Sequence, residues 1–440
     1  MPVRLRYSLL LLSMAGYILM GYFVERSNFI FLISIYSSLF LIYFYFLKYP
    51  DNLNFKTAIF AGLLFRGVLL FSFPSLSDDI YRFMWDGRIQ QSGINPFDYT
   101  PRQLLALHPD TYLISLFPDL NSPDYYSVYP QILQVIFRIT VEIAGENTLI
   151  AAFIFKFIIL IFEAGTIYLL FQIFKINKLN PKLIYIYVLN PLVIIELTGN
   201  IHFEALMIFF LLLTAFLIQQ NKHKLSIAAL VLAIQAKLIP AILIPLLIKE
   251  SGFWKTFFYG LSCLIIFYIL SPYLWGEPDK FFNFLTSLKL YYGKFEFNGG
   301  IYSILSGAGW WISGFNPIYF VSKLMMGLTI AGFVYVYFKN KNFLTGMFWL
   351  FAIYLIFSAV VHPWYLTTLI VLCPFVNFRF ALIWSALIPL TYITYQTSPY
   401  QQNYWIIAIE YTAVFAFLFY EFRTTHKAGV KNPSQNLLLV

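Results

Sequence analysis

Two adjacent aspartates, Asp78 and Asp79, stand where an apolar stretch of the chain ends, in the run SLSDDIYRFMWDGR. Adjacent carboxylates repel each other, and near low-dielectric lipid at least one should have a perturbed pKa, which suits a general base. Arg82 lies four residues from both Asp78 and Asp86, so these side chains can also pair along a helix and stabilise it slightly. The open alternative is therefore a salt-bridged helix without a catalytic role.

The residues around these aspartates predict a short helix. Ser77 can cap its N-terminus, where the following carboxylates favour the positive end of the helix dipole. Tyr81, Met84, Trp85 and Arg88 share one face at helical spacing. Such a face is typical of an amphipathic helix that lies at a membrane interface.

Other side chains that could bind a ligand stand in or beside apolar stretches. Lys237 interrupts a long apolar run, and a lysine in such a place usually faces a cavity or an ionic partner, here a carboxylate such as Glu196. His202 stands at the start of an apolar stretch, and the run HPWY places His362 and Trp364 beside a helix-breaking proline. Each also has a plain structural interpretation, as a packed histidine or an aromatic anchor at the membrane interface.

The composition predicts a multispanning membrane protein. Of the 440 residues, 60% are hydrophobic and only 11% are charged, and the mean hydropathy is +0.73. A soluble domain carries about a quarter charged residues. Apolar stretches of about 17–25 residues, the length that crosses a bilayer as a helix, recur along the chain. Cys263 and Cys373 lie in such stretches and indicate neither a disulfide framework nor a metal cluster.

We expect an all-α polytopic fold of about twelve transmembrane helices in a single membrane-embedded domain over residues 1–440. A further apolar stretch, 225–248, is interrupted at the run KLIP, which predicts a broken re-entrant hairpin. The first large outer loop, 75–147, should carry interfacial helices. The spans are expected near residues 8–24, 28–47, 56–73, 148–172, 183–198, 203–219, 254–274, 317–338, 343–361, 363–377, 380–396 and 403–421.

The distribution of charge predicts the orientation of the chain. With the N-terminus inside, 17 of the 29 Lys and Arg residues fall in cytoplasmic connections or in the tail at 422–440, as the positive-inside bias requires. Seven of the nine Asp residues lie in the segment 75–127 on the opposite side. We therefore expect function at the outer surface. The net charge of +9 reflects orientation in the membrane, and no nucleic-acid partner is expected.

The run DDxYRxxWDGR at residues 78–88, followed by GxNPFxYxP at 93–101, resembles the first outer loop of bacterial GT-C glycosyltransferases. The polyprenyl-phosphate-mannose-dependent mannosyltransferases are the most similar subset. Three shorter stretches are similar to that group as well: YSVYP at 126–130, HFE at 202–204 and KLIP at 237–240. Gln131 departs from the pattern, because a second proline is expected there.

This resemblance implies transfer of a sugar, expected to be mannose, from a polyprenyl-phosphate donor to a glycolipid or glycan acceptor, with inversion at the anomeric carbon. It makes Asp79 the first choice, and Asp78 the second, for the base that accepts the acceptor's proton. Positive groups should stabilise the leaving lipid phosphate. The candidates for binding the donor phosphate or the sugar are Arg82, Arg88, Lys237, His202, His362 and Trp364.

No cofactor and no metal are expected, because two adjacent carboxylates are too few ligands for an all-protein cation site. The resemblance also implies a bacterial inner-membrane location, an active site that faces the periplasm and two cytoplasmic termini. The main alternative is a transporter or flippase of lipid-linked sugars, which would spread ionisable residues along several spans and repeat its halves. A polymer ligase would need a late outer loop rich in Arg and His, and residues 275–300 contain neither.

Overall fold

The computed structural model describes residues 3–271, 273, 278–293, 295–315, 317–340 and 342–427. Within these ranges the chain is helical, and extended pairing is limited to isolated bridges from Phe297 and Asn298 to Val360. The chain divides into two compact units. Unit 1 comprises Met1–Leu69, Ala164–Leu197 and Phe295–Val440, and unit 2 comprises Leu70–Glu163 and Thr198–Lys294.

Several helices confirm that this is a multi-pass membrane protein. Among the described residues, five helices are long and apolar enough to cross a bilayer, and a bent pair at Pro181–Val188 and Pro191–Gly199 could supply a sixth span. Shorter apolar helices make up much of the remainder, so the predicted number of about twelve spans stays a prediction. The five long helices are α1 (Val3–Tyr22), α2 (Phe29–Lys48), α8 (Thr148–Asn177), α17 (Ile318–Lys339) and α21 (Tyr404–Lys427).

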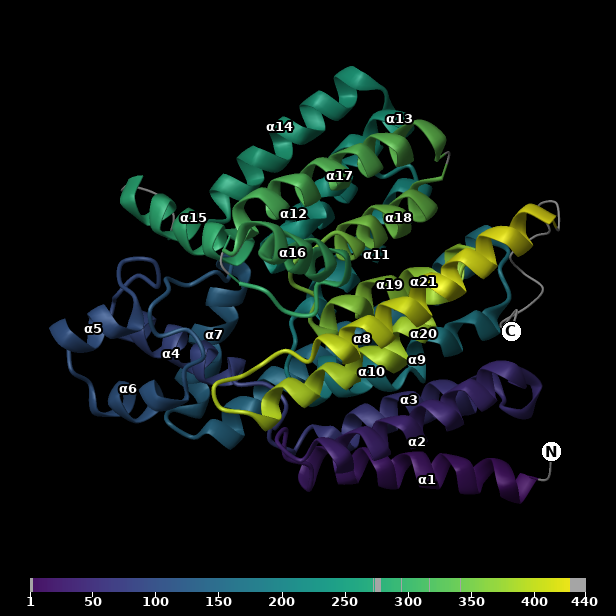
Figure 1. The fold of residues 1–440 in the computed structure, drawn as a ribbon, viewed down its shortest axis with the longest axis horizontal. Helices are drawn as coiled ribbons and strands as arrows, with labels where there is room; N and C mark the ends of the chain where they lie inside the picture. Colours follow the sequence, from purple (N-terminus) through teal and green to yellow (C-terminus); the bar gives the residue numbers. More distant parts are fainter. Residues whose placement is uncertain are drawn as a thin grey trace. The chain divides into compact units, whose positions relative to one another are not determined.

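Unit 1 contains the N-terminal helices and most of the C-terminal ones (Figure 1). Helix α1 packs against both α2 and α3. Glu196 is fully buried and accepts hydrogen bonds from Tyr36 Oη at 2.7 Å and Tyr392 Oη at 2.9 Å. The other helices of unit 1 are α3 (Phe55–Leu69), α9 (Tyr185–Val188), α10 (Pro191–Val193), α16 (Gly300–Ser313), α18 (Phe343–Ile356), α19 (Thr367–Leu372) and α20 (Phe380–Leu387).

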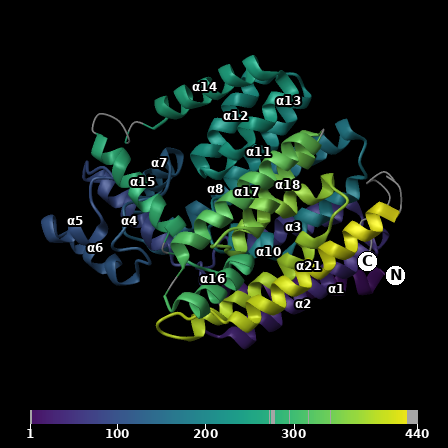
Figure 2. The same ribbon diagram turned by 45° about the horizontal axis from the view of Figure 1, so that its top comes forward.

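Unit 2 contains the first large loop and the segment after residue 198. Helices α11 and α12 form a hairpin, and α12 also contacts α7 and α14 (Figure 2). The loop 75–147 carries four α-helices, whose place at the membrane interface stays a prediction, while α15 lies in a stretch where no helix was predicted. The helices of this unit are α4 (Asp79–Gln91), α5 (Pro101–Leu107), α6 (Thr111–Leu116), α7 (Gln131–Ala144), α11 (Glu204–Gln219), α12 (His223–Ala236), α13 (Leu247–Ser251), α14 (Phe253–Ile269) and α15 (Pro278–Gly293).

The predicted break in the stretch 225–248 is confirmed. Helix α12 ends at Ala236, and Lys237 follows in an extended conformation with φ −160° and ψ 138°. The chain continues as a 3-10 helix at Ile239–Leu246, which begins with Leu238 at its N-cap position and Pro240 in its first turn. Pro240 favours this break because proline disfavours an α-helical conformation of the residue before it and lacks an N–H donor.

Helix α4 begins at the paired aspartates, as predicted, but its cap lies one residue later than expected. Asp78 occupies the N-cap position without a side-chain capping bond, and Ser77 Oγ instead accepts from the Asp79 N–H at 3.3 Å. The helix ends at Gln91, and Gly93 follows with φ +76°. That left-handed conformation is the usual end of a helix and favours glycine, which explains the glycine at this position of the motif.

The expected amphipathic face of α4 is buried in protein. Met84 and Trp85 are fully buried. Met84 Sδ accepts from Tyr112 Oη of α6 at 3.7 Å, and the Trp85 ring lies 6.3 Å from the Phe117 ring. The interpretation as a surface helix with these side chains at the lipid interface was therefore wrong, because α6 and the turn after it cover that face.

The glycine and the aspartate of the DGR run also have structural roles. A Cβ at Gly87 would lie 2.6 Å from the Phe137 carbonyl oxygen, so α4 and α7 can approach this closely only at a glycine. Asp86 is fully buried and accepts from Arg82 Nε at 2.9 Å, Ser127 Oγ at 2.5 Å and Gln134 Nε2 at 3.0 Å. A buried carboxylate is tolerable only with such partners, so Asp86 joins α4, the YSVYP stretch and α7.

The NPF part of the motif connects the first loop to α15. Asn95 Nδ2 donates to the Tyr273 carbonyl oxygen at 2.7 Å, and Phe97 is fully buried with its ring edge-on to Phe284 of α15. Gln131, which stands where a proline was expected, accepts through Oε1 from the Tyr273 N–H at 3.4 Å. These residues therefore hold Tyr273 and α15 against the loop.

Candidate active site

Asp79 lies at the first position of α4, where the unsatisfied N–H groups of the helix favour a negative charge. Its side chain is partly buried, and Oδ1 accepts from Asn121 Nδ2 at 2.8 Å. Asp78 precedes it at the N-cap position and is partly buried as well. The two carboxylates predicted from sequence therefore remain adjacent in space, and one of them is oriented by an amide from a different part of the loop.

The chain that enters α11 lies against the start of α4. Asn200 Oδ1 accepts from the Leu76 N–H at 3.1 Å, and the Phe203 ring lies 5.3 Å from the Phe83 ring of α4. This turn follows a π-helical stretch at Ile194–Gly199 and contains Ile201 with φ +61°. A β-branched residue in the left-handed region is strained, and such strain and π-helical turns cluster at functional sites.

His202 and Glu204 arrive in this strained turn. His202 is buried directly before Phe203, the N-cap residue of α11, and Glu204 is the first residue of that helix. Lys237 directly follows α12, at the same open end of the α11–α12 hairpin as Glu204. Its Nζ donates to Glu204 Oε1. Lys237 thus pairs with the carboxylate of Glu204, whereas the example named from sequence was Glu196.

The charges around Asp79 act on its ionisation. Burial is the largest influence and raises the pKa of Asp79 from 3.8 to about 6. The hydrogen bond from Asn121 lowers that pKa, the negative charges of Glu204 and Asp78 raise it, and the positive charge of Lys237 lowers it. A carboxylate with a pKa near 6 is ionised at neutral pH yet holds a proton more firmly than an ordinary aspartate, as a general base requires.

Arg82 pairs with Asp86, which was one of the two alternatives left open. The buried guanidinium also donates from Nη1 to the carbonyl oxygens of Ser122 at 3.2 Å and Tyr125 at 3.0 Å. Ser122 directly follows Asn121 in the chain. Arg82 therefore holds in place the loop that brings Asn121 to Asp79, and its predicted contact with phosphate or sugar stays a prediction.

Arg88 pairs with neither aspartate of the motif. Its Nη2 lies 3.1 Å from Asp110 Oδ2, and both side chains are about one third exposed. Asp110 also caps α6 by accepting from the N–H groups of Tyr112 and Leu113. Arg88 thus ties the second half of α4 to α6, and a contact with donor or sugar stays a prediction for it too.

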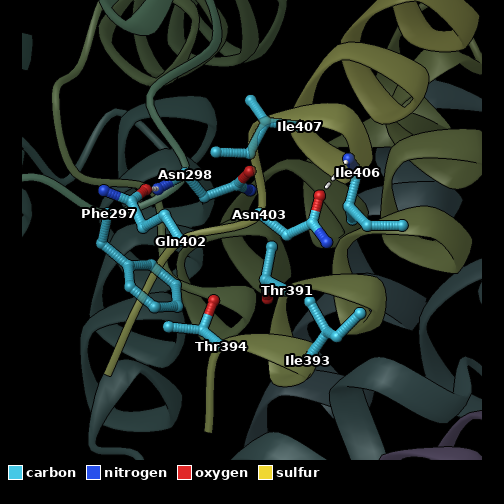
Figure 3. A pocket seen from close by; sticks show the side chains of 9 residues that line it. All are labelled: Phe297, Asn298, Thr391, Ile393, Thr394, Gln402, Asn403, Ile406 and Ile407. Atoms are coloured by element: carbon cyan, nitrogen blue, oxygen red, sulfur yellow. Dashed lines mark hydrogen bonds between the residues drawn. The ribbon is translucent and has the colours of Figure 1, made fainter. Parts of the chain in front are cut away.

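His362 and Trp364 belong to unit 1, where their rings stack. The centroids of the His362 and Trp364 rings lie 4.4 Å apart, and the ring planes are 3° from parallel. The Phe297 ring also stacks on His362, with 4.5 Å between the ring centroids. Phe297 also lines a small pocket with Asn298 and Gln402 (Figure 3). That pocket has room for about one water-sized sphere, about 10 Å³, so it is too small for a sugar.

A larger hollow of about 520 Å³ lies in unit 2 beside Ile89, Ser92 and Asp110. These residues belong to the C-terminal end of α4 and to α6's cap, whereas Asp79 begins α4. Neither this hollow nor the small pocket of unit 1 is lined by Asp79. Asp79 is therefore singled out by the charged and hydrogen-bonding groups around it.

Metal ligands of the usual kind do not gather in the described part of the chain. No three His, Cys, Asp or Glu side chains there are grouped as a metal site would require. The adjacent Asp78 and Asp79 would supply two carboxylates, and the nearby Glu204 is engaged by Lys237. The expectation of a reaction without a metal stays a prediction.

Comparison with known proteins identifies the sequence family. Residues 33–250 match the family model described as alpha-(1->6)-mannopyranosyltransferase, N-terminal domain. This part of the chain is similar to that family. The chain is also 23% identical to alpha-(1->6)-mannopyranosyltransferase A of Corynebacterium glutamicum over 403 aligned residues, which cover 80% of this chain and 77% of that protein. No solved structure matches the chain.

The match to the mannopyranosyltransferase family confirms the resemblance found in the motifs. Both comparisons name transferases, and neither names a transporter. The matched residues 33–250 include the paired aspartates, the HFE stretch and Lys237, whereas His362 and Trp364 lie outside them. The charged cluster of unit 2 thus lies wholly inside the part that carries the family's sequence pattern.

Two residues of this cluster were not among the sequence candidates. Glu204 was part of a recognised motif, but its pairing with Lys237 depends on the α11–α12 hairpin, which brings together positions 33 residues apart. Asn121 carried no sequence signal, because it stands in an irregular loop 42 residues after Asp79. Its contact depends on the turn that Arg82 stabilises.

Proposed function

We propose that this membrane mannosyltransferase transfers a mannosyl residue from a polyprenyl-phosphate donor to a hydroxyl of a glycan or glycolipid acceptor. The acceptor oxygen attacks the anomeric carbon from the face opposite the phosphate, so the configuration inverts. As the new bond forms, the hydroxyl proton passes to the Asp79 carboxylate. As the old carbon–oxygen bond breaks, its electron pair leaves with the polyprenyl phosphate. The alpha-(1->6) linkage in the name of the relative is proposed for this chain as well.

The observation that carries this proposal is the environment of Asp79. Its carboxylate is partly buried, oriented by Asn121 and flanked by a lysine, and its pKa is about 6. Raised pKa values of this kind are typical of catalytic carboxylates. Asp78 adds negative charge beside the base and is the second choice for that role.

Lys237 is proposed to bind the donor phosphate. Its side chain is 27% exposed although it follows an apolar helix, so the ammonium group is accessible beside Asp79. A cation there stabilises the charge that develops on the leaving phosphate. His202 is proposed to donate to the same phosphate or to the sugar. The stacked His362 and Trp364 of unit 1 are proposed to contact a sugar ring, because aromatic faces suit its apolar side.

The side of the membrane and the donor lipid follow from the same scheme. The seven aspartates of the segment 75–127 oppose the cytoplasmic basic residues, which supports a periplasmic site with both termini in the cytoplasm. A donor whose isoprenoid tail stays in the bilayer suits a base that closely follows the predicted span 56–73. No soluble cofactor has a role in this scheme.

The proposal is tested by transfer of radiolabelled mannose in membranes that contain the full-length chain. We expect transfer from polyprenyl-phosphate mannose, little from a nucleotide-linked mannose, and a loss of about 10²–10⁴-fold in Asp79→Asn. Asp119→Asn is the matched control, because that carboxylate is exposed in the same loop. Transfer by Asp79→Asn at the parent rate, or use of the nucleotide sugar as donor, would contradict the proposal.

A further inference from the structure

The open end of the α11–α12 hairpin carries an ion pair whose acidic member has no role in the scheme above. Lys237 Nζ donates to Glu204 Oε1, and the side chains of Glu204 and Lys237 are 6% and 27% exposed. A carboxylate buried to this degree requires a charged or hydrogen-bonding partner. Glu204 is anchored as the first residue of a helix, whereas Lys237 follows one in extended backbone. The rigid member of the pair is therefore the acid.

This pair lies beside the proposed base. The residues just before Glu204 contact the start of α4 through the bond from the Leu76 N–H to Asn200 Oδ1 and through the packing of Phe203 on Phe83. Both charges of the pair act on Asp79, together with Asp78 and the amide of Asn121.

We propose that Glu204 is a positioning residue for the transfer reaction and that it presents Lys237 to the donor phosphate. The bound phosphate neutralises Lys237 and thereby strengthens Asp79 as a base. An ammonium group has three N–H donors, so an ammonium that contacts Glu204 can also donate to an anionic oxygen. This inference rests on the proposed function and names a residue to which that function assigns no role.

The physical consequence is a coupling between donor binding and proton transfer. In the free enzyme Lys237 lowers the pKa of Asp79. A bound phosphate brings a negative charge to the same ammonium group, so Asp79 then holds a proton more firmly. The charge of the leaving phosphate increases as the sugar departs, and Lys237 stabilises it at the moment when Asp79 takes up the proton. Glu204 keeps Lys237 within reach of both partners.

The test is the pH dependence of transfer by the full-length chain in proteoliposomes, with polyprenyl-phosphate mannose as donor. The kcat/KM profile reports groups of the free enzyme, and the kcat profile reports groups of the donor complex. We expect the acidic limb of kcat to lie above that of kcat/KM by about half to one pH unit in the parent. Glu204→Gln should raise the donor KM about tenfold or more, change kcat less and move the kcat/KM limb to lower pH, because it removes a negative charge beside Asp79.

Two further variants separate this role from a purely structural one. Glu204→Asp keeps the charge, so its acidic limb should stay at the parent pH even if its KM rises. The double variant Glu204→Gln/Lys237→Met removes both charges, so its limb should return toward the parent pH while the donor KM stays high. An uncharged pair is also compatible with burial, so this variant provides folded protein if the single one unfolds.

The outcomes distinguish this inference from the proposed function. Suppose that Asp79→Asn loses transfer but the acidic limb of kcat/KM does not move in Glu204→Gln, or moves equally in Glu204→Asp. Glu204 then has no positioning role, and the proposed function stands. The same conclusion follows if the double variant keeps the donor KM of the parent. If Asp79→Asn transfers normally, the proposed function itself is wrong.

Discussion

Replacing Asp79 by asparagine should slow transfer by about 10²–10⁴-fold and at the same time stabilise the protein. The substitution keeps the shape of the side chain and an oxygen that can accept from Asn121, but it removes a negative charge from a partly buried site. An aspartate retained only for its negative charge at the helix N-terminus would show the opposite behaviour, because losing that charge costs about 0.3–1 kcal/mol. The stability of this one variant therefore separates the two interpretations of the paired aspartates.

The size of the effect follows from the pKa of Asp79, which rises from 3.8 to about 6 on folding. One pKa unit corresponds to about 1.4 kcal/mol, so the charged side chain disfavours the folded state by at most about 3 kcal/mol. The favourable interaction with the N-terminus of α4, about 0.3–1 kcal/mol, and contact with solvent reduce that figure. We expect Asp79→Asn to gain about 1–2 kcal/mol at neutral pH.

The sign depends on pH. Below pH 3.8 the carboxyl is protonated in both the folded and the unfolded chain, so it makes no difference to stability. The destabilising effect of the parent carboxylate grows between pH 3.8 and about 6 and is constant above that. The melting temperature of Asp79→Asn should therefore exceed that of the parent at pH 7.5 and approach it near pH 4.

The assay is thermal unfolding of the purified full-length chain in detergent, followed by tryptophan fluorescence at both pH values. Asp119→Asn, an exposed aspartate in the same loop, controls for the loss of one negative charge and should melt with the parent. A lower melting temperature for Asp79→Asn at pH 7.5 would refute this reasoning, because Asp79 would then stabilise the fold as a carboxylate.

Three further predictions follow from neighbouring residues. Arg82→Ala leaves the buried Asp86 without its ion pair, so we expect a loss of about 3–5 kcal/mol in unfolding free energy, measured by denaturation in detergent; a melting temperature equal to the parent's would contradict the pairing. Asn121→Ala removes the hydrogen bond that lowers the pKa of Asp79, so the acidic limb of the pH–rate profile should move to higher pH, and a downward shift would exclude this role. Ser92→Cys, in the exposed turn after α4, should react in whole cells with an impermeant thiol reagent added from outside, because both native cysteines are buried; labelling only after lysis would place the loop in the cytoplasm.

Sequence alone was sufficient for the long spans and for the helix that begins at Asp79. The expected spans 28–47 and 317–338 differ by one residue at each end from α2 (Phe29–Lys48) and α17 (Ile318–Lys339). Such helices are predictable because length and hydropathy alone decide them. The break at Lys237 was predictable for a similar reason, since Pro240 interrupts an otherwise uniform apolar run.

Interrupted spans and short amphipathic helices were less predictable. The stretch 183–198 was expected as one span, but Asn190 and Pro191 divide it, and its two parts meet at a bend of 51°. Helix α16 (Gly300–Ser313) was missed because its 14 residues are fewer than a helix needs to cross a bilayer. Backbone breaks of this kind are tolerated only where neighbouring protein satisfies the polar groups, and a sequence does not reveal those neighbours.

The candidate site shows the same division. The paired aspartates and Lys237 were recognisable because charge beside or within apolar sequence is costly and therefore functional or paired. Their partners were not recognisable, since Asn121 and Glu204 reach them only through tertiary packing. The burial of Trp85 was missed for a related reason, because hydropathy alone does not tell a face covered by α6 from one that faces lipid.

The most direct test of Asp79 as the base is a single-turnover measurement with the full-length chain in excess over radiolabelled polyprenyl-phosphate mannose. Binding and transfer are then separated, because the bound donor is measured before the acceptor is added. We expect Asp79→Asn to bind the donor as the parent does and to transfer its sugar at least about a hundredfold more slowly. Transfer by that variant at the parent rate in the first turnover would contradict the assignment of the base.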